Sequence, residues 1–151
     1  MNTRLFFIVI SIFTGAVAVT SPAYAKDPIY TGRFSNLAVS GYDPVAYFTQ
    51  SRPVKGSSDY EYSYKGAQWR FSSMENLERF QANPDAYAPQ YGGYCAWAAA
   101  QNYTARGNPK YWTVVDGKLY INYNAKIQAR WEKDIPGFIA KANANWPGIL
   151  N

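Results

Sequence analysis

Two stretches of the chain alternate apolar and polar residues with the two-residue period of a β-strand. In the first, a tyrosine occupies every second position from Tyr60 to Tyr64, Lys65-Gly66 interrupts the pattern, and "QWRFS" resumes it. In the second, "WTVVDGKLYINY", Asp116-Gly117 separates two runs rich in β-forming residues. Asp-Gly pairs favour the tight turns that join antiparallel strands. The pattern therefore predicts two β-hairpins.

Other segments carry apolar residues at helical spacing. Met74, Leu77 and Phe80 recur in this way, Ser73 before them suits a helix N-cap, and Pro84 ends the segment. Helices are also expected in "YCAWAAAQ", over 124–134 and over 136–145, while the apolar run 45–48 suits either a short strand or a helical turn. Strands and helices follow one another without a repeating βαβ unit. The predicted fold class is α+β, a small single domain with two β-hairpins and several short helices.

The apolar positions of these elements predict the core. The residues expected to be largely buried are Trp69, Phe71, Leu77, Phe80, Trp112, Val114, Tyr120 and Trp131. Aromatic residues make up 18% of the chain, and the large area that each can bury supports a core in a domain with one cysteine and hence no internal disulfide.

The first residues, "MNTRLFFIVISIFTGAVAVTSPAYA", combine Arg4, an apolar run and the small-x-small ending Ala23-Tyr24-Ala25. This pattern is typical of a cleaved signal peptide, and the apolar run stops short of the length that spans a bilayer. We expect a signal peptide at 1–25, a mobile or loosely docked leader at 26–36 and the domain at 37–151. The mature protein is then periplasmic or secreted, with no membrane contact after signal cleavage.

The charge distribution and the absence of histidine exclude several classes of function. The formal net charge is +5, but the lysines and arginines are scattered, so a nucleic-acid surface is not expected. The chain has no histidine, which removes the commonest general base and the commonest metal ligand. Catalytic triads with histidine and the usual zinc motifs are therefore excluded, and enzyme activity is disfavoured.

Two residues stand out as candidates for chemistry. Cys95 follows Gly92-Gly93 in "YGGYCAW", where a sharp turn would place the thiol at a helix start and lower its pKa. The alternative, favoured by the alanines around it, is a buried and mainly structural thiol. Asp43 in "SGYDPVAYF" suits an Asx turn that binds a local N–H, with a ligand-facing carboxylate as the alternative.

Four segments together resemble a known family. They are "SGYDPVAYF", "YKGAQWRFSSMENLERFQANPDAYAPQYGGYCAWA", "WTVVDGKLYINYN" and "WEKDIPGFIAKANANWP". In them the chain resembles the exported single-domain YHS-domain proteins of bacteria, whose wider superfamily is treble-clef-like and often holds a metal through cysteines. The resemblance implies such cysteines near 41–43 and at Ser72, Ser73 and Asn76, but none of these positions carries one.

These observations favour a non-catalytic binding module of the YHS type that engages a small ligand, a metal ion or a partner protein near "GYDPVAYF" and "YGGYCAW". The expected ligand-binding residues are Asp43, Tyr47, Tyr94, Cys95 and Trp97. Cys95 with Met74 supplies the soft donors that copper(I) prefers, whereas zinc is disfavoured. The alternatives are a thiol-dependent enzyme or redox protein using Cys95, and a purely structural interaction protein.

Overall fold

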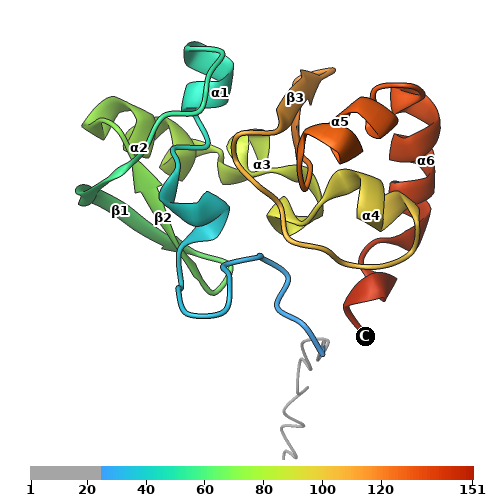
Figure 1. The fold of residues 1–151 in the computed structure, drawn as a ribbon. Helices are drawn as coiled ribbons and strands as arrows, with labels where there is room; N and C mark the ends of the chain where they lie inside the picture. Colours follow the sequence, from blue (N-terminus) through green and yellow to red (C-terminus); the bar gives the residue numbers. More distant parts are fainter. Residues whose placement is uncertain (1–24) are drawn as a thin grey trace, which may run out of the picture.

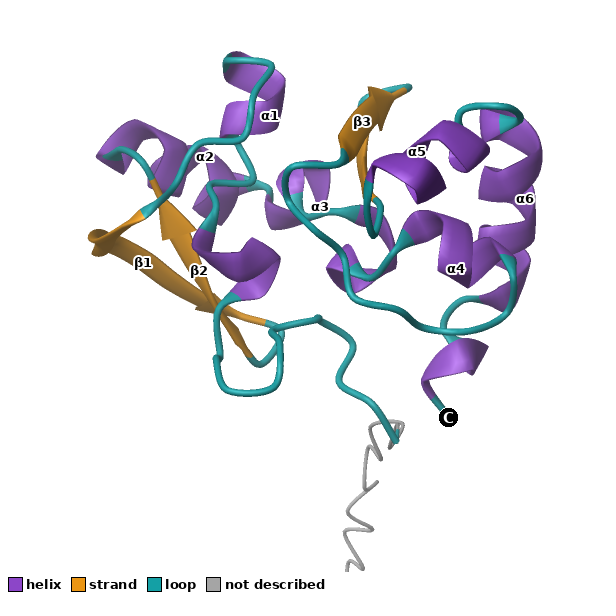
Figure 2. Cartoon of the chain, in the orientation of Figure 1, coloured by secondary structure: helices purple, strands orange, loops and turns teal. Residues whose placement is uncertain are grey.

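The computed structural model describes residues 25–151, so the predicted signal peptide lies outside the described residues. It confirms the α+β class, with two antiparallel two-stranded sheets surrounded by short helices (Figure 1, Figure 2). Over residues 25–151 no helix has both the length and the apolar character needed to cross a membrane. In chain order the elements are the 3-10 helix η1 (Ala38–Gly41), α1 (Ala46–Thr49), β1 (Ser57–Tyr64), β2 (Ala67–Phe71), α2 (Met74–Ala82), α3 (Pro84–Tyr87), η2 (Gln90–Gly93), α4 (Ala96–Ala100), β3 (Trp112–Val115), β4 (Lys118–Ile121), α5 (Ala125–Trp131), α6 (Ile135–Asn145) and η3 (Gly148–Leu150).

Both predicted hairpins are present and share one turn geometry. β1 pairs with β2, with Tyr62 opposite Trp69, and β3 pairs with β4, with Val114 opposite Leu119. At each turn both central residues have positive φ, 49° and 78° at Lys65-Gly66 and 49° and 70° at Asp116-Gly117. Two consecutive positive φ angles suit the right-handed twist of the strands, and glycine at the second position adopts them without a Cβ penalty.

Helices α2, α5 and α6 begin at side-chain caps. The Oγ of Ser73 accepts the N–H of Asn76 at the start of α2, and the Oδ1 of Asn124 accepts the N–H of Ile127 at the start of α5. The run 45–48 is helical, as α1, and not a strand. Met74 is 51% exposed, so it is not one of the residues that pack α2 against the core.

Strand β4 separates two hydrophobic clusters. Leu119 and Ile121 belong to the cluster that contains Trp69, whereas Tyr120 belongs to the cluster that contains Trp131. This division follows from the alternation of side chains along a strand, since successive residues point to opposite faces. The second hairpin therefore packs against both clusters, and the burial of β4 depends on both of them.

Six of the eight predicted core residues are buried. They are Trp69, Phe71, Leu77, Phe80, Tyr120 and Trp131. Trp112 and Val114 are half-buried and pack against the first cluster, so for these two the prediction of extensive burial was too strong. Both lie on β3, whose residues are all half-buried, whereas three of the four residues of β4 are buried.

The leader 26–36 makes specific contacts with the domain. Ile29 is 6% exposed and belongs to the first cluster, and the N–H of Tyr30 donates to the carbonyl of Gly92 at 2.9 Å. Gly92 has a φ of 61°, and a Cβ there would collide with the carbonyl oxygen of Pro28. These contacts attach the leader to the domain near η2.

Candidate functional site

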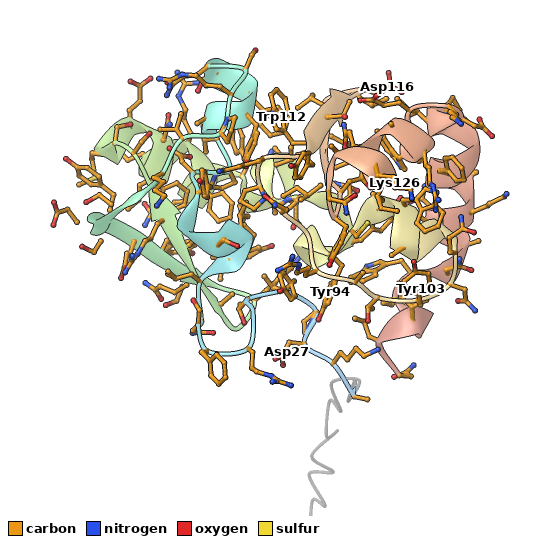
Figure 3. All side chains as sticks on the ribbon, viewed as in Figure 1. Asp27, Tyr94, Tyr103, Trp112, Asp116 and Lys126 are labelled. Atoms are coloured by element: carbon orange, nitrogen blue, oxygen red, sulfur yellow. The ribbon has the colours of Figure 1, made fainter. Side chains whose placement is uncertain are left out.

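A cavity of about 330 Å³ lies between α4 and the start of α5. It is called the Trp97 pocket below, and the side chains around it include Cys95, Trp97, Tyr103, Tyr123, Lys126 and Arg130. Figure 3 labels Tyr103 and Lys126, which lie on the same side of the molecule near α4 and α5. Binding sites for small molecules are usually concave and mostly apolar with a few polar groups, and this cavity has that composition.

A buried amide, Asn122, joins the elements that form the pocket. Its Oδ1 accepts the N–H of Trp97 at 3.0 Å, and its Nδ2 donates to the Oε1 of Gln128 at 2.8 Å. Asn122 is completely buried, and these bonds connect the first turn of α4 to the middle of α5. No sequence pattern indicated Asn122, since an asparagine directly after a strand is ordinarily a turn residue.

Three aromatic rings line the pocket, and two of them have a guanidinium group nearby, that of Arg130, which lines the pocket, and that of Arg106, which does not. The Tyr103 ring meets the Trp97 ring edge-on at 6.5 Å between centroids, and Tyr103 is 47% exposed. The guanidinium carbon of Arg130 lies 5.6 Å from the Trp97 centroid, and that of Arg106 lies 4.9 Å from the Tyr123 centroid. Both distances are within the range of cation–π attraction, which orients the two guanidinium groups.

The pocket is positively charged. Lys126 and Arg130 line it, and no aspartate or glutamate does. Among residues 25–151 the ion pairs join Lys65 to Asp85, Arg70 to Glu61 and Arg79 to Glu75. In the described part of the chain neither pocket cation therefore has a carboxylate within 4.0 Å.

Cys95 forms part of the pocket wall but is only 1% exposed. Its Sγ lies 3.6 Å from the Oδ1 of Asn122, which suits a thiol that donates to the amide oxygen. Burial raises the pKa of the Cys95 thiol, and the backbone N–H groups near it oppose this only in part. The site therefore favours the neutral thiol, which is the poorer nucleophile and metal ligand.

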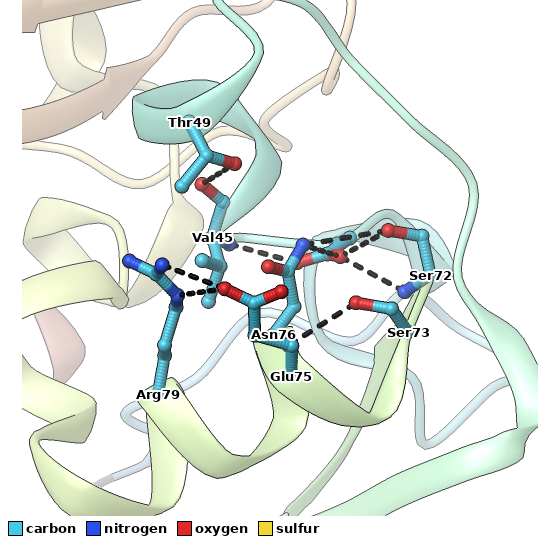
Figure 4. A network of polar contacts seen from close by, with 8 residues as sticks. Val45, Thr49, Ser72, Ser73, Glu75, Asn76 and Arg79 are labelled. Atoms are coloured by element: carbon cyan, nitrogen blue, oxygen red, sulfur yellow. Dashed lines mark hydrogen bonds and ion pairs between the residues drawn. The ribbon is translucent and has the colours of Figure 1, made fainter.

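Asp43 is a completely buried carboxylate at the centre of a hydrogen-bond network (Figure 4). Its Oδ1 accepts the N–H groups of Val45 and Ala46 at 2.8 and 3.3 Å. Its Oδ2 accepts the N–H and Oγ–H of Ser72 and the Nδ2–H of Asn76, at 2.7 to 2.8 Å. Asp43 thus makes the expected Asx turn and also joins α1 to the start of α2. Positions 43, 72 and 76, where the resemblance implies a metal, hold this network instead.

The first hairpin and the hydrogen-bond partners of Asp43 lie in a segment that matches a known family. Residues 45–91 match the YHS domain. The match includes α1, both strands of the first hairpin, α2 and α3. The Trp97 pocket lies C-terminal to the YHS match. No curated protein and no solved structure matches the chain significantly.

The five predicted ligand-binding residues fall into two groups. Cys95 and Trp97 line the pocket. Asp43, Tyr47 and Tyr94 are buried elsewhere; the Tyr47 hydroxyl donates to the Pro109 carbonyl and the Tyr94 hydroxyl to the Asp27 carbonyl. Burial raises the pKa of both phenols. These three side chains connect α1, α2, the leader and the loop before β3, and they do not line the Trp97 pocket.

The predicted metal donors are not together. Met74 begins α2 beside the first hairpin, whereas Cys95 precedes α4 in the other half of the molecule (Figure 1). Within residues 25–151 no group of three or more histidine, cysteine, aspartate or glutamate side chains could hold a metal ion. The Met74 and Cys95 pair therefore does not fit a shared copper site.

Proposed function

We propose that the protein is an exported, non-catalytic binding module in which the YHS domain supports a small-ligand site in the Trp97 pocket. The observation that carries this proposal is the pocket itself, which joins three aromatic walls to two cations without carboxylate partners in the described chain. Both cations line the cavity and are exposed, so they are accessible to a ligand that enters it.

Several features support binding over catalysis. The chain has no histidine, and the one thiol at the pocket is buried and held neutral by its surroundings. Nucleophilic catalysis by cysteine requires a thiolate and an adjacent base, and neither a carboxylate nor an imidazole lines this pocket. The thiol-dependent alternative thus lacks both an activated sulfur and a partner.

Export is the part of the proposal that rests on Met1–Ala25 alone. N-terminal sequencing of the protein from its own host tests it: a start at or beside Lys26 supports cleavage and release. Recovery of the Met1 form in the membrane fraction would contradict it.

Native mass spectrometry of protein purified from its own host tests the ligand site. The parent should retain an additional small mass. Ala105→Phe, which would place a ring in the pocket, should lose it, and Phe34→Ala, a change at a side chain that is 94% exposed and outside the pocket, should keep it. Equal retention by all three proteins would show that the bound molecule lies elsewhere, and retention of a polypeptide mass would favour the interaction-protein alternative.

A further inference from the structure

We propose that the ligand of the Trp97 pocket is a small planar organic anion, an aromatic carboxylate, with its ring against Trp97 and its charge at Lys126 and Arg130. This inference rests on the proposed function, since it assigns a chemical class to the same site. Three independent features of the pocket support it: its size, the position of its cations and the geometry of Arg130.

The size and walls of the pocket suit one flat ring system. Its volume of about 330 Å³ is at the lower end of small-molecule sites, which excludes a large cofactor. Trp97 and Tyr103 present ring surfaces, while Ile127 and Ala105 add aliphatic walls. Aromatic rings prefer offset-stacked or edge-to-face neighbours, so a planar ligand would continue the edge-on contact already present between Trp97 and Tyr103.

The two cations lie close together on one helix. Lys126 and Arg130 are four residues apart on α5, where like charges face one another and repel. Lys126 also lies in the first turn, where the helix dipole disfavours a positive charge. Arg130 lies in the last turn, where the dipole favours a cation, and both residues are exposed, so the repulsion between them is modest. Neither has a carboxylate within 4.0 Å among residues 25–151, and a bound anion would relieve the remaining repulsion.

Arg130 is oriented for an anion beside a ring. Its guanidinium stacks on Trp97 with 5.6 Å between the guanidinium carbon and the ring centroid, which restricts a long flexible side chain before any ligand arrives. A guanidinium offers paired N–H donors that match the two oxygens of a carboxylate, and Lys126 adds a second charge. Ring and cation together therefore select a ligand that carries both an aromatic surface and a carboxylate.

Isothermal titration calorimetry with three probes tests the class: 2-naphthoate, its neutral amide 2-naphthamide, and cyclohexanecarboxylate. The parent should bind 2-naphthoate at least tenfold more tightly than either other probe, and the affinity should fall with added salt. Arg130→Gln and Lys126→Gln should each weaken the binding of 2-naphthoate by roughly three- to tenfold, a modest effect because both residues are exposed. Lys141→Gln, a lysine of α6 outside the pocket, is the matched control and should bind as the parent does.

Binding of the amide as tightly as the carboxylate would overturn the anionic class. If Ala105→Phe abolished the binding of the amide, the pocket would still be a ligand site, but for a neutral ligand. The inference also fails if no carboxylate binds at millimolar concentration while native mass spectrometry still finds a retained mass that Ala105→Phe removes. Retention of that mass by both Ala105→Phe and Phe34→Ala would instead contradict the proposed function.

Discussion

The sulfur of Cys95 lies 3.6 Å from the Oδ1 of Asn122, and the same oxygen accepts the N–H of Trp97 at 3.0 Å. One buried amide therefore holds the thiol, the first turn of α4 and, through its Nδ2, the Gln128 side chain of α5. Cys95 therefore belongs to the buried structure that supports the pocket, and the reactivity of its thiol can be tested.

Thiol labelling distinguishes the structural role of Cys95 from a reactive one. A thiol that is 1% exposed and favoured in its neutral form should react with a disulfide reagent at neutral pH far more slowly in the folded protein than in denaturant. The labelling rate should follow the unfolding equilibrium as denaturant is added. Labelling of the native protein at the rate of the unfolded chain would show that the thiol is accessible and reactive.

The raised thiol pKa predicts a loss of stability in alkaline solution. The unfolded thiol titrates near 8.5, so its contribution to folding is complete below about pH 8.5 and is lost as the pH rises toward the folded pKa. From about pH 8.5 to 10 the free energy of unfolding should fall by up to about 1 kcal/mol per pH unit more steeply in the parent than in Cys95→Ala. Urea denaturation at several pH values measures both slopes.

The buried tyrosines do not obscure this comparison. Burial raises the pKa of Tyr47, Tyr91 and Tyr120, so their effect on folding begins only above about pH 10, and it is common to both proteins. Parallel slopes for the parent and Cys95→Ala below pH 10 would contradict the raised thiol pKa.

Replacement of Trp69 by alanine should strongly destabilise the domain. Trp69 is completely buried, packs against Phe80 with 4.9 Å between ring centroids, and donates its Nε1–H to the Tyr64 carbonyl. We expect Trp69→Ala to lower the free energy of unfolding by about 3–5 kcal/mol. Phe34→Ala removes a ring that is 94% exposed and should change it by less than about 0.5 kcal/mol, as chemical denaturation would show. A similar melting temperature for both variants would contradict the core assignment.

The Asp43 network predicts a large effect from a nearly isosteric change. Asp43→Asn replaces one carboxylate oxygen by an NH₂ group that faces other donors, Ser72 and Asn76 on one side or the Val45 N–H on the other. We expect a loss of about 2–4 kcal/mol in the free energy of unfolding. Asp116→Asn makes the same change in an exposed hairpin turn where asparagine tolerates a positive φ, so it should have little effect. Equal stability of both variants would show that Asp43 is not the centre of a tight network.

The ligand types in the chain also predict that zinc is not a structural component. Structural zinc sites usually have four ligands from cysteine and histidine, and the chain offers one buried cysteine. Dialysis against EDTA should leave the melting temperature within about a degree of the untreated protein. A stoichiometric zinc content that survives a weak chelator, with a lower melting temperature after its removal, would refute this.

Local patterns in the sequence were sufficient for both hairpins and for the longer helices, but not for the short helix α3 or the three 3-10 helices. The alternation from Tyr60 to Phe71 and the Asp116-Gly117 turn predicted both hairpins, because side-chain period and turn chemistry act over a few residues. The Ser73 cap and the spacing of Leu77 and Phe80 predicted α2 for the same reason. Where the local signal was ambiguous, as over 45–48, the helical turn of α1 follows from the capping bonds that Asp43 makes to Val45 and Ala46.

The sequence by itself determined the fold class, the hairpins, most of the core and the absence of histidine chemistry. Tertiary structure alone decided that Met74 and Cys95 are apart, that Asp43 accepts donors from Ser72 and Asn76, about thirty residues away, and that Cys95 and Trp97 share a pocket with Lys126 and Arg130. Contacts between residues far apart in the chain depend on how β4 and the helices pack against one another. No local period encodes such contacts, so a single sequence predicts the elements more readily than the site they form.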